Sequence, residues 1–312
     1  ENAYAVCEFP IIYYITAFLY LLFGEQEFIL KSINLLILSI GCYHLFRLSM
    51  LLLKDFALSI LTVFFLFSSV VFVYYGFNYL PDSAALGLTF SAWYFYHKFL
   101  EVKNLKALFY CFSLLTLAAL LKATYFIQPI AIILLLIIVY KDDIKFYFRK
   151  IFPFFLISGF IVLIWNLYVF YFNAKHHSDY FTTSTLPIWD LSKNEISLIW
   201  DEMLGEWYKK YLAESSFHFY LFICLIGLYL GIVRYKKLLI LIVILFLGTL
   251  SYFILFYQQF KYHDYYFLLM IPFVYFSLVL GLKGISEKFK NKPVFISIFK
   301  LVFFVVVIAG IN

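Results

Sequence analysis

The chain has 312 residues, of which 65% are apolar and 24% aromatic, whereas only 13% are charged, with a net charge of +6. A soluble domain usually carries charge on about 25% of its residues. Together with a mean hydropathy of +0.94, this composition excludes a soluble globular enzyme, a disordered chain and a nucleic-acid-binding module, because lipid must solvate so much apolar surface. The four cysteines lack metal-ligand spacing and predict neither a disulfide framework nor a zinc site.

Long apolar runs predict helices that cross a bilayer, each of which needs about 20 residues. Strands are not expected, because the short alternating segments of a membrane barrel do not occur and a helix satisfies its own backbone in lipid. The predicted fold class is all-α: a polytopic membrane bundle of about ten transmembrane helices with further helices at the outer face. The predicted spans are, in chain order, 28–53, 56–81, 83–96, 107–121, 123–140, 151–174, 217–233, 238–260, 265–282 and 301–311.

Lysine and arginine gather in four short loops, and two predicted spans separate each loop from the next. The positive-inside rule therefore places all four loops on the cytoplasmic side. The longest of the other loops, residues 173–216, holds seven acidic residues against four lysines, which suits the outer side. The basic clusters are Lys98, Lys103 and Lys106; Lys141, Lys145, Arg149 and Lys150; Arg234, Lys236 and Lys237; and Lys283, Lys288, Lys290 and Lys292.

The same pattern predicts four regions: an outer juxtamembrane segment at 1–27, an N-terminal transmembrane bundle at 28–172, an outer loop at 173–216 and a C-terminal transmembrane bundle at 217–312. Within the first region, an apolar helix after Pro10 is expected to lie at the outer face or re-enter the membrane. The alternative is that it crosses, which would place its start inside.

An amphipathic helix is expected within the outer loop. Ser192 and Glu195 form the S-x-x-E pattern of a capping box, and apolar residues recur after them at helical spacing. Two tryptophans on the apolar stripe suit a helix in the membrane interface. Such a helix either caps the outer mouth of the protein or contacts the substrate.

Ionisable residues at the ends of apolar runs are candidate functional residues, because charge is costly at membrane depth. Glu8, Asp82, Lys122 and the segment 261–264, which contains His263, all fall at the outer end of the bundle by span parity. Their convergence suits chemistry on an anionic, lipid-linked substrate. A cation there stabilises a leaving phosphate, and a carboxylate accepts a proton from an acceptor hydroxyl.

Each of these residues also has a structural alternative. Lys122 can snorkel to the interface, Asp82 and Glu8 can cap the helices that follow them, and His263 can be a hydrogen-bonded interfacial residue. The adjacent histidines 176–177 in the outer loop are a further metal candidate.

Four segments, in order, are similar to motifs of bacterial GT-C membrane glycosyltransferases. These enzymes are related to the dolichyl-phosphate-mannose protein mannosyltransferases and to the lipid A aminoarabinose transferases. The similarity covers most of residues 7 to 275. The segments are 7–14 (CEFPIIYY) with 22–24 (LFG), like E-F-P-L-Y…L-F-G; 79–82 (YLPD), like P-D; 120–124 (LLKAT), like L-x-K; and 263–266 (HDYY) with Pro272, like H-D-Y-Y…P.

The resemblance implies an inverting transfer of a sugar from a polyprenyl-phosphate donor to a lipid, glycan or protein acceptor, at the outer face of a bacterial cytoplasmic membrane. It implies that Asp82 and Glu8 are catalytic carboxylates and that Lys122, His263 and Tyr265 lie near the lipid phosphate. Glu8 and His263 are also candidate ligands of a divalent metal. No nucleotide is expected, since the chain has no G-x-x-x-x-G-K loop. The family's first-loop catalytic Asp comes before the E-F-P segment, so we expect it to precede residue 1.

The main alternative is a transporter or flippase of lipid-linked sugars. That class is built from inverted repeats with Gly- or Pro-broken helices, whereas no repeat is evident here and the prolines lie mostly near span ends. A glycan polymerase or ligase would use arginines in the outer loops. The three arginines, Arg47, Arg149 and Arg234, are all predicted inside. A purely structural membrane protein is disfavoured by the clustered outer charges.

Overall fold

The structure is a computed structural model that describes residues 5–140, 143–178 and 185–311. These residues form α-helices and short turns of tighter or wider helix, with no strand among them, so the prediction of an all-α polytopic membrane protein is confirmed. Among the described residues, six helical segments are long and apolar enough to cross a membrane. They comprise α2 (Glu27–Leu53), α8 (Ile144–Lys175), α11 (Glu214–Arg234), α12 (Lys236–Leu255), α13 (Ile271–Lys288) with the turn before it, and α14 (Pro293–Ile311).

Four of the ten expected spans are not among these six segments, and two features account for three of the four. First, α6 (Leu105–Leu121) and α7 (Ile127–Val139), which a 3₁₀ turn at Ala123–Phe126 precedes, are short. Second, α5 (Asp82–Val102) is long but is less apolar than the other membrane helices, and most of its side chains are buried. Because α5 faces other helices and not lipid, it carries polar side chains that a lipid-facing helix would not.

A sharp break interrupts the run that was expected to be one straight span at 56–81. The chain forms α3 (Phe56–Phe65) and α4 (Val70–Gly76), with a bend of 86° between them; counted as one span, they would make a seventh. Ser69 leaves the helical conformation, and its hydroxyl caps α4 by accepting from the Phe72 amide at 3.1 Å.

The segment between α8 and α11 supplies hydrogen bonds at this break. The amide of Ala213 donates to the carbonyl of Ser68 at 2.9 Å. The Ser69 hydroxyl donates to the carbonyl of Lys210 at 3.4 Å. Tertiary partners therefore satisfy backbone groups where the helix ends.

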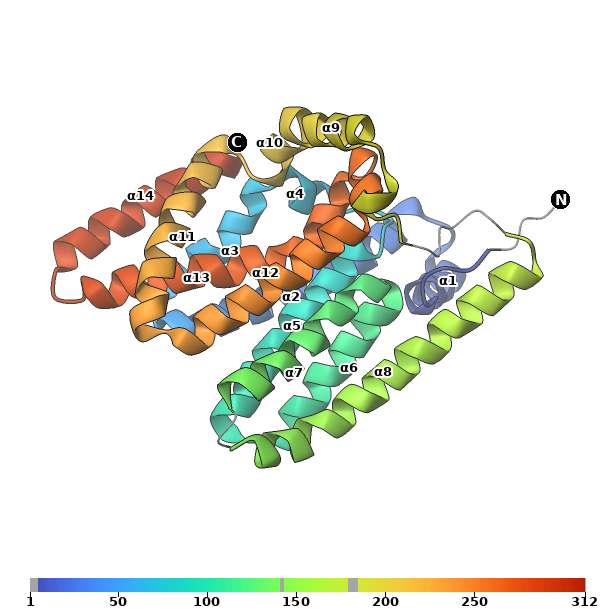
Figure 1. Ribbon diagram of the computed structural model, residues 1–312, viewed down its shortest axis with the longest axis horizontal. Coiled ribbons are helices and arrows are strands. Elements are labelled where there is room, and N and C mark those ends of the chain that lie inside the picture. The colour runs from blue at the N-terminus through green and yellow to red at the C-terminus, as the bar shows by residue number, and fades with distance from the viewer. Residues whose placement is uncertain (1–4, 141–142, 179–184, 312) are drawn as a thin grey trace.

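Helix α5 runs through the middle of the bundle and packs along α2 and α6. Figure 1 shows α6, α7 and α8 on one side of it and α11 to α14 on the other. Glycines let two helix pairs approach closely, as small residues do in membrane proteins. A Cβ added at Gly41 of α2 would lie 2.4 Å from the Cα of Gly87 of α5. A Cβ added at Gly227 of α11 would lie 3.1 Å from the Cα of Gly281 of α13.

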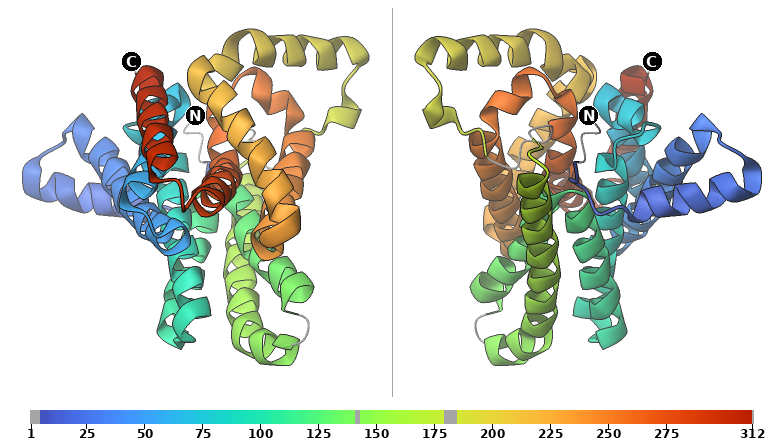
Figure 2. Two further views of the ribbon diagram at one scale, coloured as in Figure 1. Left: turned by 90° about the vertical axis from the view of Figure 1, so that its left-hand side faces the viewer. Right: turned by 90° about the vertical axis from the view of Figure 1, so that its right-hand side faces the viewer.

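Two helices lie across the direction of α8 at the periphery (Figure 2). One is α1 (Ile11–Phe23), which follows Pro10, and most of its large apolar side chains are exposed. The other is α9 (Lys193–Glu202), which continues through a π-helical turn at Met203–Trp207 into α10 (Tyr208–Tyr211). The predicted capping box at its start is confirmed, because Ser192 and Glu195 bond each other's backbone amides.

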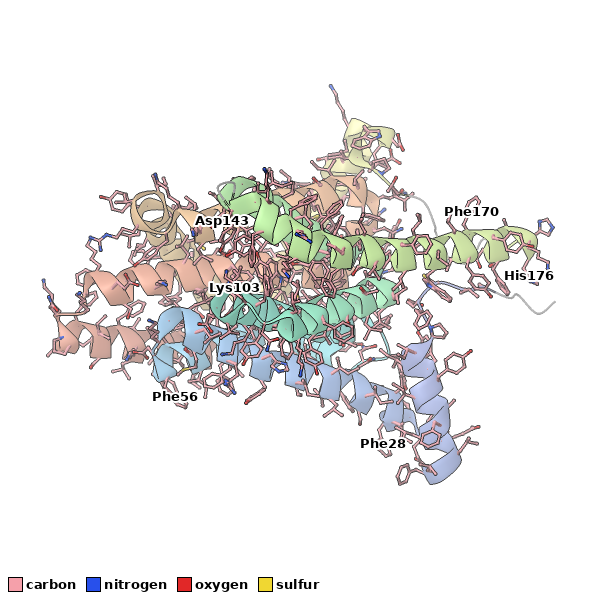
Figure 3. All side chains as sticks on the ribbon, turned by 90° about the horizontal axis from the view of Figure 1, so that it is seen from below. Phe28, Phe56, Lys103, Asp143, Phe170 and His176 are labelled. Atoms are coloured by element: carbon pink, nitrogen blue, oxygen red, sulfur yellow. The ribbon has the colours of Figure 1, made fainter. Side chains whose placement is uncertain are left out.

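Helix α8 extends beyond its neighbours. Figure 3 shows it from Asp143, beside its first turn, to Phe170 and His176 near its far end. The helix begins seven residues before the expected apolar run and so includes the basic residues Lys145, Arg149 and Lys150. The far end of α8 holds the N-terminal segment in place, as described below.

Candidate functional site

The centre of the candidate site is an ion pair between Lys122 and Asp82. Lys122 follows the last residue of α6 in an extended conformation, and Asp82 is the first residue of α5. The ammonium nitrogen lies 3.4 Å from Asp82 Oδ1, with side-chain exposures of 22% for Lys122 and 6% for Asp82. The Lys122 ammonium is therefore partly exposed, whereas the Asp82 carboxylate that pairs with it is buried.

Two tyrosine rings also face the Lys122 ammonium. Tyr265 and Tyr266 belong to the 3₁₀ turn Asp264–Met270, which leads into α13. The ammonium lies 5.2 Å and 5.3 Å from their ring centres, within the range of a cation–π contact. Burial alone would lower the pKa of Lys122. The Asp82 carboxylate has the larger opposing effect, with smaller contributions from the two tyrosines and Glu8, and the pKa of Lys122 is raised above its ordinary value. Lys122 is therefore a cation at physiological pH.

His263 lies beside the same rings. It stacks on Tyr266 with 5.8 Å between ring centres and 15° between ring planes. Burial, and next the charge of Lys122, lower its pKa, so His263 is a neutral hydrogen-bonding group at pH 7. Its neighbour Asp264 is directed toward α4, where it accepts a hydrogen bond of 2.7 Å from the Tyr75 hydroxyl.

Glu8 lies on a segment that is fixed between α6 and α8. The amide of Phe9 donates to the carbonyl of Leu120 at 2.9 Å. The buried Asn173 side chain, near the end of α8, accepts from the amide of Val6 at 2.9 Å and donates to its carbonyl at 2.8 Å. Trp165 of α8 packs edge-on against Phe9 with ring centres 4.9 Å apart.

This arrangement brings Glu8 close enough to Lys122 and Asp82 for their charges to act on its pKa. Burial, which is the largest effect, raises the pKa of Glu8 above its ordinary value, and Lys122 offsets part of that rise. Glu8 is half-buried and binds its proton more tightly than a solvated glutamate does.

Asp82 and Glu8 do not cap the helices that follow them. Pro81 occupies the N-cap position of α5, and Pro10 occupies that of α1. Neither helix has a side-chain hydrogen bond at its cap.

The metal ligands expected from the sequence were Glu8 and His263, with the histidines 176–177 as further candidates. Within the described parts of the chain, neither these nor any other three His, Cys, Asp or Glu side chains gather in a way that could hold a metal ion.

An apolar groove of about 550 Å³ leads to the site between α7 and α12. The end of the groove next to Lys122, its upper end in Figure 1, is lined by Ala123, Thr124 and Tyr252. Tyr252 stacks on Tyr266 with 5.6 Å between ring centres. Exposed aliphatic side chains on both helices line its length, so the groove opens toward lipid. These include Ile130, Leu134, Ile138 and Leu247.

Sequence reasoning missed the groove and several tyrosines. The tyrosines are Tyr75, Tyr252 and Tyr125, and the Tyr125 hydroxyl donates to the carbonyl of Asp82 at 3.2 Å. Tyrosine is too common in this chain for its position alone to indicate a site. The small residue Gly248, where a Cβ would lie 2.8 Å from Ile127 Cγ2, marks a close approach of α12 to α7 and does not indicate the groove.

The multi-pass helical fold, with a buried cationic site at the end of a lipid-facing groove, is typical of the GT-C class of membrane glycosyltransferases. The family model of the dolichyl-phosphate-mannose-protein mannosyltransferases matches residues 8–173, more than half of the chain. The chain belongs to this family. The match contains Glu8, Asp82 and Lys122, whereas His263 and Tyr265 lie beyond it. No curated protein matches the chain.

Proposed function

We propose that the protein transfers a sugar from a polyprenyl-phosphate donor to an acceptor hydroxyl at the outer face of a bacterial cytoplasmic membrane. The observation that carries the proposal is the Lys122 ammonium, held by buried Asp82 at the upper end of an apolar groove. A cation beside an apolar groove matches a ligand with an anionic phosphate and a long hydrocarbon chain. Family membership supports glycosyl transfer as the reaction.

In this proposal the donor phosphate lies against Lys122, with Tyr265 and His263 as its hydrogen-bonding neighbours. The prenyl chain follows the groove between α7 and α12. Asp82 fixes the ammonium in place. Glu8, on the fixed segment between α6 and α8, is the candidate carboxylate for the acceptor's proton among the described residues.

The proposed step is a single inverting displacement. The acceptor oxygen forms a bond to the anomeric carbon on the face opposite the phosphate, while the bond from that carbon to the phosphate oxygen breaks. The electron pair of the broken bond stays on the phosphate, where Lys122 stabilises the added charge. The acceptor proton passes to the carboxylate. Holding the two substrates together supplies much of the remaining rate.

Charge distribution supports an outward-facing site. Helix α5 has Asp82 at one end and Lys98 and Lys103 near the other, and its 21 residues span about 30 Å. The basic turn between α11 and α12 and the one after α13 follow the ends of helices remote from Lys122. Basic loops of this kind face the cytoplasm.

The proposal is tested by narrowing the groove. Ser251 lies on the groove wall in α12, is exposed, and its hydroxyl bonds only its own helix. We expect Ser251→Phe to raise KM about tenfold for a donor with a long prenyl chain, because the added ring occupies volume that the chain needs. A donor too short to reach Ser251 should keep its KM. Transfer is measured with the full-length protein in detergent.

Leu250→Phe is the matched control, since Leu250 is an exposed neighbour on the same helix that does not line the groove. If Ser251→Phe changed the KM of long and short donors equally, or changed neither, the prenyl chain would not lie in this groove. If no sugar is transferred from any donor, and labelled lipid instead moves between the leaflets of vesicles, the protein is a transporter.

The pH dependence of transfer tests the role of Glu8. An ionised Glu8 is needed to accept a proton, so the rate should rise with pH through its raised pKa, above the ordinary glutamate value of about 4.3. Glu8→Gln should lower kcat about 100-fold or more and remove this acidic limb. An unchanged profile in Glu8→Gln would exclude Glu8 as the proton acceptor.

The pH dependence of stability should be opposite to that of the rate. Because the folded state raises the pKa of Glu8, its contribution to stability is present at low pH and is lost as pH rises through that pKa. Glu8→Gln should therefore melt at a higher temperature than the parent at neutral pH, and the difference should shrink in acid.

A further inference from the structure

A second cavity, of about 530 Å³, lies at the basic end of the bundle, among the ends of α5, α7, α11, α12 and α13. It is separate from the Lys122 site, because Tyr96 on its wall is 14 residues further along α5 than Asp82, which corresponds to about 21 Å. Among the described residues, no acidic side chain lines it. Its cationic lining residues are Arg234, Lys236, Lys237 and Lys283.

The nearest acidic side chain among the described residues is that of Glu287, which accepts a hydrogen bond from the Tyr235 hydroxyl at the edge of the cavity. None of the four cations forms a salt bridge within the described ranges 5–140, 143–178 and 185–311. Lys237 lies over the ring of Tyr140 at 4.8 Å, and Lys283 over that of Tyr235 at 5.4 Å. Aromatic contacts of this kind position an ammonium and leave its charge in place.

One residue of the cavity wall, Tyr96, carries a buried polar group. Tyr96 is 0% exposed, and among the described residues its hydroxyl has no hydrogen-bond partner. A buried hydroxyl without a partner is unfavourable, so a ligand that accepts its hydrogen bond would remove that cost.

Aliphatic side chains form the remaining wall of the cavity. They come from five different helices, α2, α5, α7, α11 and α12, and include Leu52, Leu100, Leu135, Val233 and Leu241. The cavity thus combines four cations and a free hydroxyl with an aliphatic surface.

From this combination we infer that the cavity binds an anionic membrane phospholipid. The phosphate head group lies among the four cations, the Tyr96 hydroxyl donates to a phosphate oxygen, and the acyl chains follow the aliphatic wall. Basic pockets between membrane helices bind anionic lipid head groups in this way. Free inorganic phosphate shares the head-group chemistry and makes no use of the aliphatic wall.

The test counts lipid bound to the full-length, delipidated protein in neutral detergent by native mass spectrometry. Dioctanoyl phosphatidylglycerol is the probe, and phosphatidylcholine with the same chains and inorganic phosphate are the comparisons. We expect the parent to bind phosphatidylglycerol in preference to both. Lys236→Gln combined with Lys237→Gln should weaken that binding about tenfold or more, since each cation near a lipid surface contributes to it.

Lys145→Gln combined with Arg149→Gln is the charge-matched control, because both residues are exposed, lie at the same end of the bundle and do not line the cavity. Tyr96→Phe gives an independent test that removes no internal hydrogen bond. It should leave the lipid-free melting temperature unchanged or higher and weaken phosphatidylglycerol binding several-fold.

Three results would overturn the inference. The first is an equal loss of phosphatidylglycerol binding in the cavity and control variants, and the second is equal binding of phosphatidylcholine and phosphatidylglycerol by the parent. The third is undiminished phosphatidylglycerol binding both in Tyr96→Phe and in the double lysine variant. Saturation by inorganic phosphate alone, with no gain from acyl chains, would show that the cavity binds an ion and not a lipid.

Discussion

Replacing Lys122 with methionine is expected to lower kcat/KM for sugar transfer by about 100- to 1,000-fold, because the leaving phosphate would lose the cation that stabilises it. The same change leaves the Asp82 carboxylate buried without its partner. Breaking a buried ion pair by removing one member costs about 3 kcal/mol or more. The single variant is therefore expected to lose stability as well as activity.

A double variant separates these two effects. Lys122→Met with Asp82→Asn removes both charges, so its thermal midpoint in detergent should recover toward that of the parent while transfer remains lost. Lys292→Met is the matched control, since Lys292 is exposed, its ammonium lies over Phe289, and it follows the end of α13 that is remote from Lys122. Substantial transfer by a well-folded double variant would show that Lys122 does not hold the phosphate.

Gly87→Ala is expected to give the largest loss of stability from a single methyl group. An added Cβ would lie 2.6 Å from the carbonyl oxygen of Ile37 and 2.7 Å from the Cα of Leu38, which are backbone atoms of α2. The two helices would have to separate, and overpacking of this kind costs about 3 kcal/mol. At about 2–4 °C per kcal/mol, the thermal midpoint should fall by roughly 6–12 °C.

Gly159→Ala in α8 is the comparison. Its Cβ would meet only the end of the Phe126 ring, at 3.4 Å, and alanine favours a helix over glycine by about 1 kcal/mol. This variant should be neutral or slightly stabilised. If Gly87→Ala is equally well tolerated, the close approach of α2 and α5 is not a determinant of stability.

The sequence predicts the helices well, because runs of apolar residues bounded by lysines report directly on burial in lipid. The expected run at 28–53 coincides with α2 to within a residue. Span parity also indicated that Asp82 and Lys122 share one end of the bundle, and the structure brings them into contact.

What the sequence could not predict depends on tertiary partners. No proline or glycine marks the break at Ser69, where hydrogen bonds from residues 210–213 stabilise the ends of two short helices. Nor does an apolar pattern distinguish α5, enclosed by protein, from helices that face lipid. The groove could not be foreseen for a similar reason, since it depends on which faces of α7 and α12 diverge.

The hydrogen bonds between Val6 and Asn173 have a consequence for biogenesis. They join residues 167 positions apart, so Glu8 leaves the ribosome early but is fixed only after the whole of α8 has been inserted. Tyr265 and Tyr266, which complete the surroundings of Lys122, are synthesised later still. Such long-range contacts form slowly. A nascent chain released before residue 266 would therefore contain helices α1 to α12 and still lack a formed site.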